Sequence, residues 1–249
     1  MLEGLSKFKE YFQDYTDSYV LIGGAACNIL FAQADTAFRA TRDLDMVLIL
    51  DALTAEFALR FWDFIKAGKY RHISAGSGKP QFYRFDKPQT EGFPKMIELF
   101  SKTDFELWKH TGITPLHVDD HISSLSAILL DDSYYQILQA GRIITNGYSV
   151  LRPEYLILFK AKAYLDLCER KKHGEQIDSS DVRKHKKDVL RLAVEMILEP
   201  VSDLPKPVRN DIRLFISNLD DDPFDAHSLR SYKVTSEQVA DKLKSIFLI

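Results

Sequence analysis

The chain has 249 residues, which is enough for one large domain or two modest ones. Hydrophobic residues make up 45% of the chain, so it can build a substantial core. The formal net charge of -3 argues against a protein whose whole surface coats nucleic acid, although it leaves room for a local basic groove.

Secretion and membrane insertion find no support in the sequence. Residues 1–17 have the pattern of a polar amphipathic helix, which differs from a signal segment. No apolar run approaches the roughly 20 residues that span a bilayer. The two cysteines, Cys27 and Cys168, lie far apart on expected helices, which is typical of reduced thiols. We therefore expect a cytoplasmic protein that has no membrane partner.

The first part of the chain alternates helical and strand patterns. Helices are expected over residues 5–14, 24–33 and 53–67, and strands over residues 18–22, 43–50, 69–75, 80–86 and 94–101. The apolar residues of segment 122–130 are too closely spaced to distinguish a helix from a strand. Asn146-Gly147, flanked by two short β-prone runs, predicts a hairpin over residues 142–150.

From residue 153 onward the pattern is helical. Helices are expected over residues 153–172, 179–198, 205–219 and 235–247. A mixed half over residues 1–152 followed by a helical half over residues 153–249 predicts an α+β protein with two packed lobes. Ligand sites often lie in the cleft between such lobes, and we expect one there.

Residues 19–50 contain two motifs that carry chemistry. An apolar strand leads to Gly23-Gly24 and a short apolar helix, and the next strand opens with Asp43 and Asp45. Residues i and i+2 of a strand point to the same face, so these two carboxylates project together. They repel each other unless a cation lies between them. Mg²⁺ is often held by one or two carboxylates together with substrate phosphates.

The two glycines complete this pattern. Glycine lets a ligand approach the backbone closely, and the free N–H groups at a helix start attract phosphate. Taken alone, Gly-Gly is common in ordinary turns and Asp-x-Asp is common at solvated strand ends. Together, with a helix between them and apolar strands on both sides, they predict a site for a cation and a phosphate.

This stretch resembles the nucleotidyltransferase superfamily that includes DNA polymerase beta. The superfamily signature is an apolar strand, Gly-Gly or Gly-Ser, a helix, and then Asp-x-Asp on the next strand. The form Arg39-x-Thr41-x-Asp43-Leu44-Asp45 is similar to that of the abortive-infection type of nucleotidyltransferase toxin. The resemblance is looser over residues 94–101 and 153–192. It implies a mixed-sheet nucleotidyltransferase core with a C-terminal helical bundle.

The resemblance also implies a third acidic ligand, for which Glu98 is the candidate. Glu98 is a lone acid in the apolar run 95–100, and a buried carboxylate is costly unless it is paired or bound to a metal. The family more often has Asp here. Glu98 can instead lie at a strand end facing water, or beside the metal without touching it. With Asp43 and Asp45 it would hold Mg²⁺ or Mn²⁺ for a two-metal transfer of a nucleoside monophosphate from an NTP.

Basic residues are the expected partners of the triphosphate. Gly23 and Gly24 would lie under the phosphates, and Arg39, Lys160 or Lys184 would offset the charge of the leaving pyrophosphate, while Thr41 orients the turn before the second strand. The family tends to carry Lys and then Asp three or four residues later, which Lys184, His185 and Asp188 match loosely. Lys184 and Asp188 lie one helical turn apart and can pair. The run can equally be a solvated basic helix face.

The acceptor is left open by the residues themselves. The toxin-like subfamily makes RNA, such as tRNA, the first candidate, followed by a small hydroxylated antibiotic and then a protein side chain. A neighbouring antitoxin protein is a possible partner. The alternative is a non-catalytic protein on the same scaffold that binds a nucleotide or a partner, and an unrelated α/β domain is the third interpretation.

Overall fold

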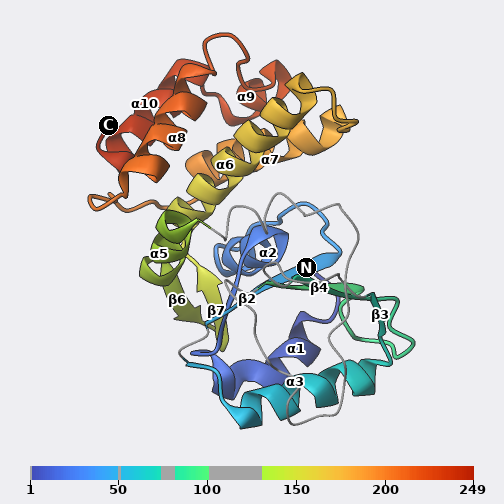
Figure 1. Cartoon of the computed structure of the whole chain (residues 1–249). Coiled ribbons are helices and arrows are strands. Elements are labelled where there is room, and N and C mark those ends of the chain that lie inside the picture. The colour runs from blue at the N-terminus through green and yellow to red at the C-terminus, as the bar shows by residue number, and fades with distance from the viewer. Residues whose placement is uncertain (1, 50–51, 74–81, 101–130) are drawn as a thin grey trace. The chain divides into compact units, whose positions relative to one another are not determined.

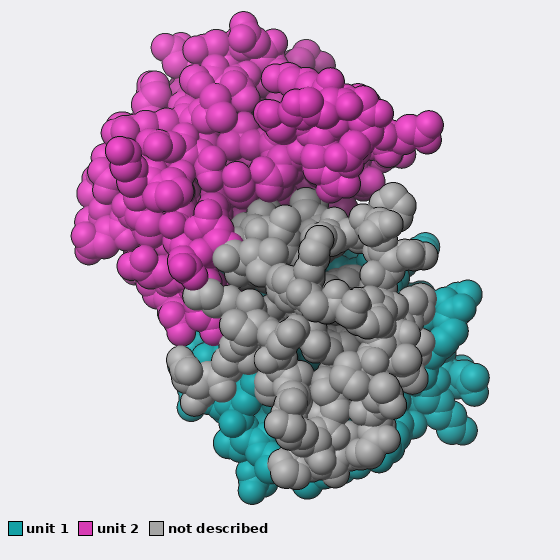
Figure 2. Space-filling view, viewed as in Figure 1, with its two compact units in different colours: residues 1–130, 142–151 teal, residues 131–141, 152–249 magenta. Residues whose placement is uncertain are grey.

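The computed structural model describes residues 2–49, 52–73, 82–100 and 131–249 (Figure 1). The chain forms two compact units, residues 1–130 with 142–151 and residues 131–141 with 152–249 (Figure 2). A mixed sheet with helices in the first unit and helices throughout the second confirm the expected α+β class. The domain limits at residues 152 and 153 stay a prediction. None of the described helices is both long enough and apolar enough to cross a membrane.

A seven-stranded mixed sheet forms the centre of the first unit. Its strands are β1 (Tyr19–Leu21), β2 (Asp43–Leu48), β3 (Arg71–Ile73), β4 (Phe82–Asp86), β5 (Met96–Phe100), β6 (Arg142–Thr145) and β7 (Tyr148–Leu151). Their order across the sheet is β3-β4-β5-β2-β1-β7-β6. β2 is parallel to β5 and β1 is parallel to β7, whereas the other neighbours are antiparallel. The expected strands are thus confirmed within the described residues. Residues 50, 74–75, 80–81 and 101 of these predictions, and segment 122–130, lie outside the described residues.

Helices cover both faces of this sheet. They are α1 (Leu5–Phe12), a short 3-10 helix (Gln13–Tyr15), α2 (Gly23–Gln33) and α3 (Ala55–Gly68). α1 and α3 lie on one face and α2 lies on the other (Figure 1). The Thr54 side chain caps α3 by accepting a hydrogen bond from the Phe57 backbone N–H at 3.1 Å, which satisfies one unpaired donor of its first turn.

An aromatic core fills the space between the sheet and the α1–α3 pair. The ring of Phe8 lies 5.3 Å from that of Tyr19 on β1, and the ring of Phe61 lies 5.5 Å from that of Phe85 on β4. Both pairs meet edge to face, the geometry that the ring quadrupoles favour. Because Tyr19 is the register partner of Leu48, the alternate residues of β2 that share the face of Leu48 also point toward this core.

The β6–β7 hairpin turns at the residues that the sequence indicates. Thr145 pairs with Tyr148 across a two-residue turn made by Asn146 and Gly147. Their φ angles are 50° and 77°, which lie in the left-handed region that an Asn-Gly turn requires. The hairpin prediction is therefore confirmed, and it places β7 beside β1 in the sheet of the first unit.

The second unit is entirely helical among its described elements. They are α5 (Asp132–Ala140), α6 (Pro153–Lys172), α7 (Ser179–Glu195), α8 (Lys206–Ser217), α9 (Ala226–Tyr232) and α10 (Ser236–Phe247). α6 packs against α5, α7 and α8. Four of these helices match the predicted ones, whereas α5 and α9 were not predicted. Both are short and capped by an aspartate, Asp131 for α5 and Asp225 for α9.

Candidate functional site

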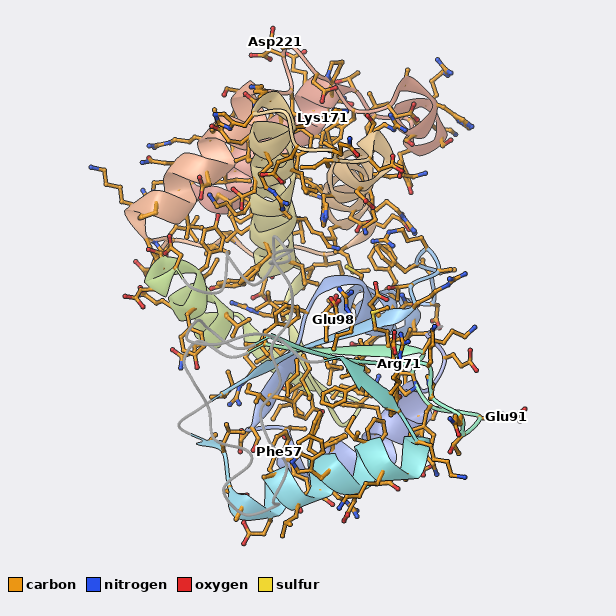
Figure 3. All side chains as sticks on the ribbon, turned by 45° about the vertical axis from the view of Figure 1, so that its right-hand side comes forward. Phe57, Arg71, Glu91, Glu98, Lys171 and Asp221 are labelled. Carbon is orange, nitrogen blue, oxygen red and sulfur yellow. The ribbon has the colours of Figure 1, made fainter. Side chains whose placement is uncertain are left out.

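Three acidic residues share the face of the sheet that α2 covers. Asp45 on β2 is the register partner of Glu98 on the parallel strand β5, and Asp43 precedes Asp45 by two residues. Neighbouring strands lie about 4.8 Å apart, so Asp45 and Glu98 are adjacent. Figure 3 shows Glu98 on the opposite side of the sheet from Phe57 of α3. The structure thus brings the three expected carboxylates to one face.

The first residue of α2 packs directly against Asp45. Gly23 has a φ of 61°, and a Cβ atom placed on it would lie 1.9 Å from Oδ2 of Asp45. The Ile22 backbone N–H donates to the Asp45 carbonyl oxygen at 3.0 Å, which fixes the strand against the helix start. Ile22 is the N-cap of α2 and gives it no side-chain cap. The positive end of the helix dipole therefore lies beside the Asp45 carboxylate.

The loop before β2 is held against the same helix start. A Cβ atom on Gly24 would lie 2.6 Å from Oγ1 of Thr41. The buried Asn28 side chain donates from Nδ2 to the Gly24 carbonyl at 3.1 Å and to the Arg39 carbonyl at 3.4 Å. Gly23, Gly24, Thr41 and the backbone of Arg39 are thus gathered at one place. Sequence reasoning missed Asn28, whose signal was a polar side chain inside an otherwise apolar helix.

Glu98 has a cationic partner that the sequence analysis did not identify. The Arg84 side chain on β4 donates to Oε1 of Glu98 from Nε at 2.9 Å and from Nη2 at 2.6 Å. The Glu98 side chain is only 12% exposed, so this ion pair compensates a largely buried charge. The available signal was a charged residue between two aromatic ones, Tyr83 and Phe85, in the strand Phe82–Asp86.

Asp43 and Asp45 suit a divalent cation better than Glu98 does. Two carboxylates on one face, beside a helix start, match the oxygen ligands with which Mg²⁺ is held together with substrate phosphates. Arg84 engages Glu98 from β4, which borders β5 on the side away from Asp45. Among the described residues, no three His, Cys, Asp or Glu side chains form a group that could hold a metal ion. The role of Glu98 as a ligand stays a prediction.

Two of the expected basic residues, Lys160 and Lys184, belong to the second unit. Nζ of Lys160 on α6 lies 2.9 Å from Oδ2 of Asp188 on α7, and their side chains are 6% and 0% exposed. Lys184 forms an ion pair with Asp181 at 3.7 Å. The sequence suggested that Lys184 pairs with Asp188, but Asp188 instead pairs with Lys160. The Lys160–Asp188 pair therefore joins two helices. The parts of Lys160, Lys184 and Asp188 in substrate binding stay predictions.

Comparison with known proteins adds little to this geometry. No protein-family model and no curated protein matches the chain. Among solved structures, the chain is similar to an antigenic nucleotidyltransferase-like protein from Paracoccidioides brasiliensis, with 14% sequence identity and a TM-score of 0.45 over 100% of both chains. A likeness of this size carries no functional conclusion.

Proposed function

We propose that this protein is a metal-dependent nucleotidyltransferase, which moves a nucleoside monophosphate from an NTP to an acceptor. The observation that supports this most is the placement of the Asp45 carboxylate. It lies on the same sheet face as Asp43 and packs against Gly23 at the start of α2. Carboxylates for a cation and N–H groups for phosphate are thus side by side, which is the combination that a metal-bound triphosphate needs.

Each residue of this group has a distinct role in the proposal. Asp43 and Asp45 would hold Mg²⁺ or Mn²⁺, which when bound offsets phosphate charge and lowers the pKa of an attacking hydroxyl. Gly23 and Gly24 let the triphosphate approach the backbone N–H groups at the helix start. Asn28 keeps the Arg39 backbone close to Gly24. In this proposal Arg39 and Thr41, on the same loop, would lie beside the phosphates.

Lys184 and Lys160 are the further cations that the resemblance implies for the triphosphate. Lys184 has the more accessible ammonium group, since its side chain is 40% exposed. Lys160 is held by Asp188, so Asp188 acts as its positioning residue. Such charges matter because phosphoryl and nucleotidyl transfer depend mainly on positioning and electrostatics.

RNA, with tRNA as the leading case, is the acceptor that we propose first. Two features support it: the resemblance of the Arg39–Asp45 stretch to abortive-infection toxins and the basic run at residues 183–187. A cytoplasmic location and a partner antitoxin follow from the same proposal. A small hydroxylated antibiotic and a protein side chain rank after RNA.

A second candidate function draws support from the Arg84–Glu98 pair. This arginine already compensates the third acidic residue, as it would in a protein that has no need of a third carboxylate for catalysis. The candidate is a non-catalytic protein that binds a nucleotide or a partner on the same scaffold. It predicts NTP binding without turnover.

Incubation with each α-labelled NTP, Mg²⁺ or Mn²⁺ and total cellular RNA tests the proposal. The Asp43→Ala variant should lose all transfer, whereas Asp63→Asn, a change of an exposed aspartate on α3, should keep it. Label in RNA supports the RNA proposal and identifies the base. Label only in protein or small-molecule fractions supports the enzyme and rejects RNA. Bound but unreacted nucleotide supports the second candidate.

A further inference from the structure

We propose that Arg84 competes with the divalent cation for Glu98, so that Glu98 joins the metal site only when Arg84 releases it. This inference rests on the proposed function, because it assumes a cation at Asp43 and Asp45. It assigns Arg84 the role of a positioning residue, which acts through Glu98 and does not itself touch the cation.

The strand register places the three groups in one row. Arg84 on β4 is the partner of Glu98 on β5, and Glu98 is the partner of Asp45 on β2. Glu98 thus has a cation on one side and a carboxylate on the other, all on one face of the sheet. An ionised Glu98 next to Asp45 is repelled by it, and Arg84 relieves that repulsion. A divalent cation at Asp45 offers Glu98 the same relief from the opposite side.

The geometry of the Arg84–Glu98 pair differs from that of its neighbour. Arg71 on β3 donates a separate hydrogen bond to each carboxylate oxygen of Asp86, from Nε to Oδ1 at 2.9 Å and from Nη2 to Oδ2 at 2.8 Å. The two bonds that Arg84 makes to Glu98 instead end on the single oxygen Oε1. The Arg84 pair therefore lacks the two-oxygen fork that makes arginine–carboxylate pairs most specific.

Exposure also makes this pair exchangeable. The Arg84 side chain is 39% exposed, whereas that of Lys160 in the buried pair of the second unit is 6% exposed. A guanidinium group that is already in contact with water loses little when it gives up one carboxylate. A buried ammonium group cannot leave its partner at such a small cost. Of these two ion pairs, the one at Arg84 is suited to open.

A titration with Mn²⁺ alone tests the competition. Electron paramagnetic resonance measures the free ion at each step. The set of proteins is native, Arg84→Gln, Glu98→Gln and the double variant. We expect Arg84→Gln to tighten Mn²⁺ binding by about 2- to 5-fold, the size of a half-exposed ion pair. In the Glu98→Gln background the same change should have no such effect, because the competed ligand is gone.

The double variant separates competition from a general charge effect. If removal of Arg84 tightens binding equally in both backgrounds, only the loss of a positive charge is at work and the proposal fails. Arg71→Gln is the matched control, since it removes an arginine from the same face two strands from β5 and should change Mn²⁺ affinity less. Unchanged or weaker binding by Arg84→Gln also overturns the proposal.

Two further comparisons keep the result decisive. If Arg84→Gln fails to fold by circular dichroism, Arg84→Lys replaces it, and we expect a smaller tightening because one bond to Glu98 persists. If native protein shows no Mn²⁺ binding that Asp43→Ala removes, the proposed function itself fails. Native binding that depends on Asp43 but ignores Arg84 leaves the proposed function intact and rejects the competition alone.

Discussion

The two faces of the sheet in the first unit are built from the same strands for different purposes. On β2, Leu44 and Met46 are fully buried and point toward the aromatic core under α1 and α3. Asp43 and Asp45 alternate with them and point toward α2. The period of two in a strand thus separates the residues of the core from those to which we assign the chemistry. Substitutions on the two faces should therefore have different consequences, which can be measured separately.

The largest loss of stability is expected from substitutions on the aromatic face, the sheet face that packs against α1 and α3. Phe61 on α3 is 0% exposed and meets Phe85 edge to face. Phe61→Ala leaves a cavity and should lower the free energy of unfolding by about 3–5 kcal/mol. Leu59→Ala on the same helix is the control, because Leu59 is 53% exposed and its loss should cost less than about 0.5 kcal/mol. Urea unfolding measures both, and equal losses would contradict the assignment of this core.

Loss of a buried charge in the second unit should lower stability about as much as loss of an aromatic side chain from the core of the first unit. Lys160→Met removes the cation that lies 2.9 Å from the fully buried Asp188 carboxylate. The free energy of unfolding should fall by about 3–5 kcal/mol, since a buried charge loses its compensation. Adding Asp188→Leu should restore part of this loss. If the double variant is less stable than the single one, the pair does more than join α6 to α7.

Gly23 lies where the start of α2 meets the acidic face, the sheet face that carries Asp43, Asp45 and Glu98. Its substitution should therefore affect stability and transfer together. Gly23→Ala places a methyl group against Oδ2 of Asp45 and forces a side chain into a φ of 61°. We expect a loss of about 1–3 kcal/mol and loss of transfer.

Gly92→Ala is the control for the backbone part of this effect. Gly92 also has a positive φ, 78°, but nothing lies within 4 Å of the position that its Cβ would take. The Gly92→Ala variant should lose stability but keep transfer activity. Equal loss of transfer in both variants would show that contact with Asp45 is not the cause.

The smallest effect is expected at the Arg71–Asp86 pair on the edge of the acidic face. The hydrogen bond from Arg71 holds the pKa of Asp86 below its ordinary value. A carboxyl group with a lowered pKa in the folded state stabilises the protein above its ordinary pKa, and this contribution is lost as the pH falls through the folded value. From pH 5 downward, the free energy of unfolding should therefore fall less steeply for Arg71→Gln than for the native protein. Identical slopes would show that the Arg71–Asp86 pair does not contribute to the pH dependence of stability.

Local patterns explain what the sequence could predict. Gly23, Asp43 and Asp45 lie in one continuous strand–helix–strand stretch, and Asn146-Gly147 determines its own turn, so short-range rules sufficed for both. The partners of Glu98 and Asp188 are 14 and 28 residues away in the chain. Such pairs depend on strand register and on helix packing, which no local period encodes. α5 and α9 are short, and their capping aspartates are weak signals without a long apolar pattern.

The most direct test of the acidic face is pyrophosphate release from NTP by native protein and by Asp43→Ala, with melting temperatures measured on the same samples. We expect release by the native protein only. The melting temperature of the variant should be unchanged or slightly higher, because removing one of two adjacent carboxylates relieves their repulsion. Continued release by the variant, or a collapse of its melting temperature, would contradict a catalytic role for Asp43.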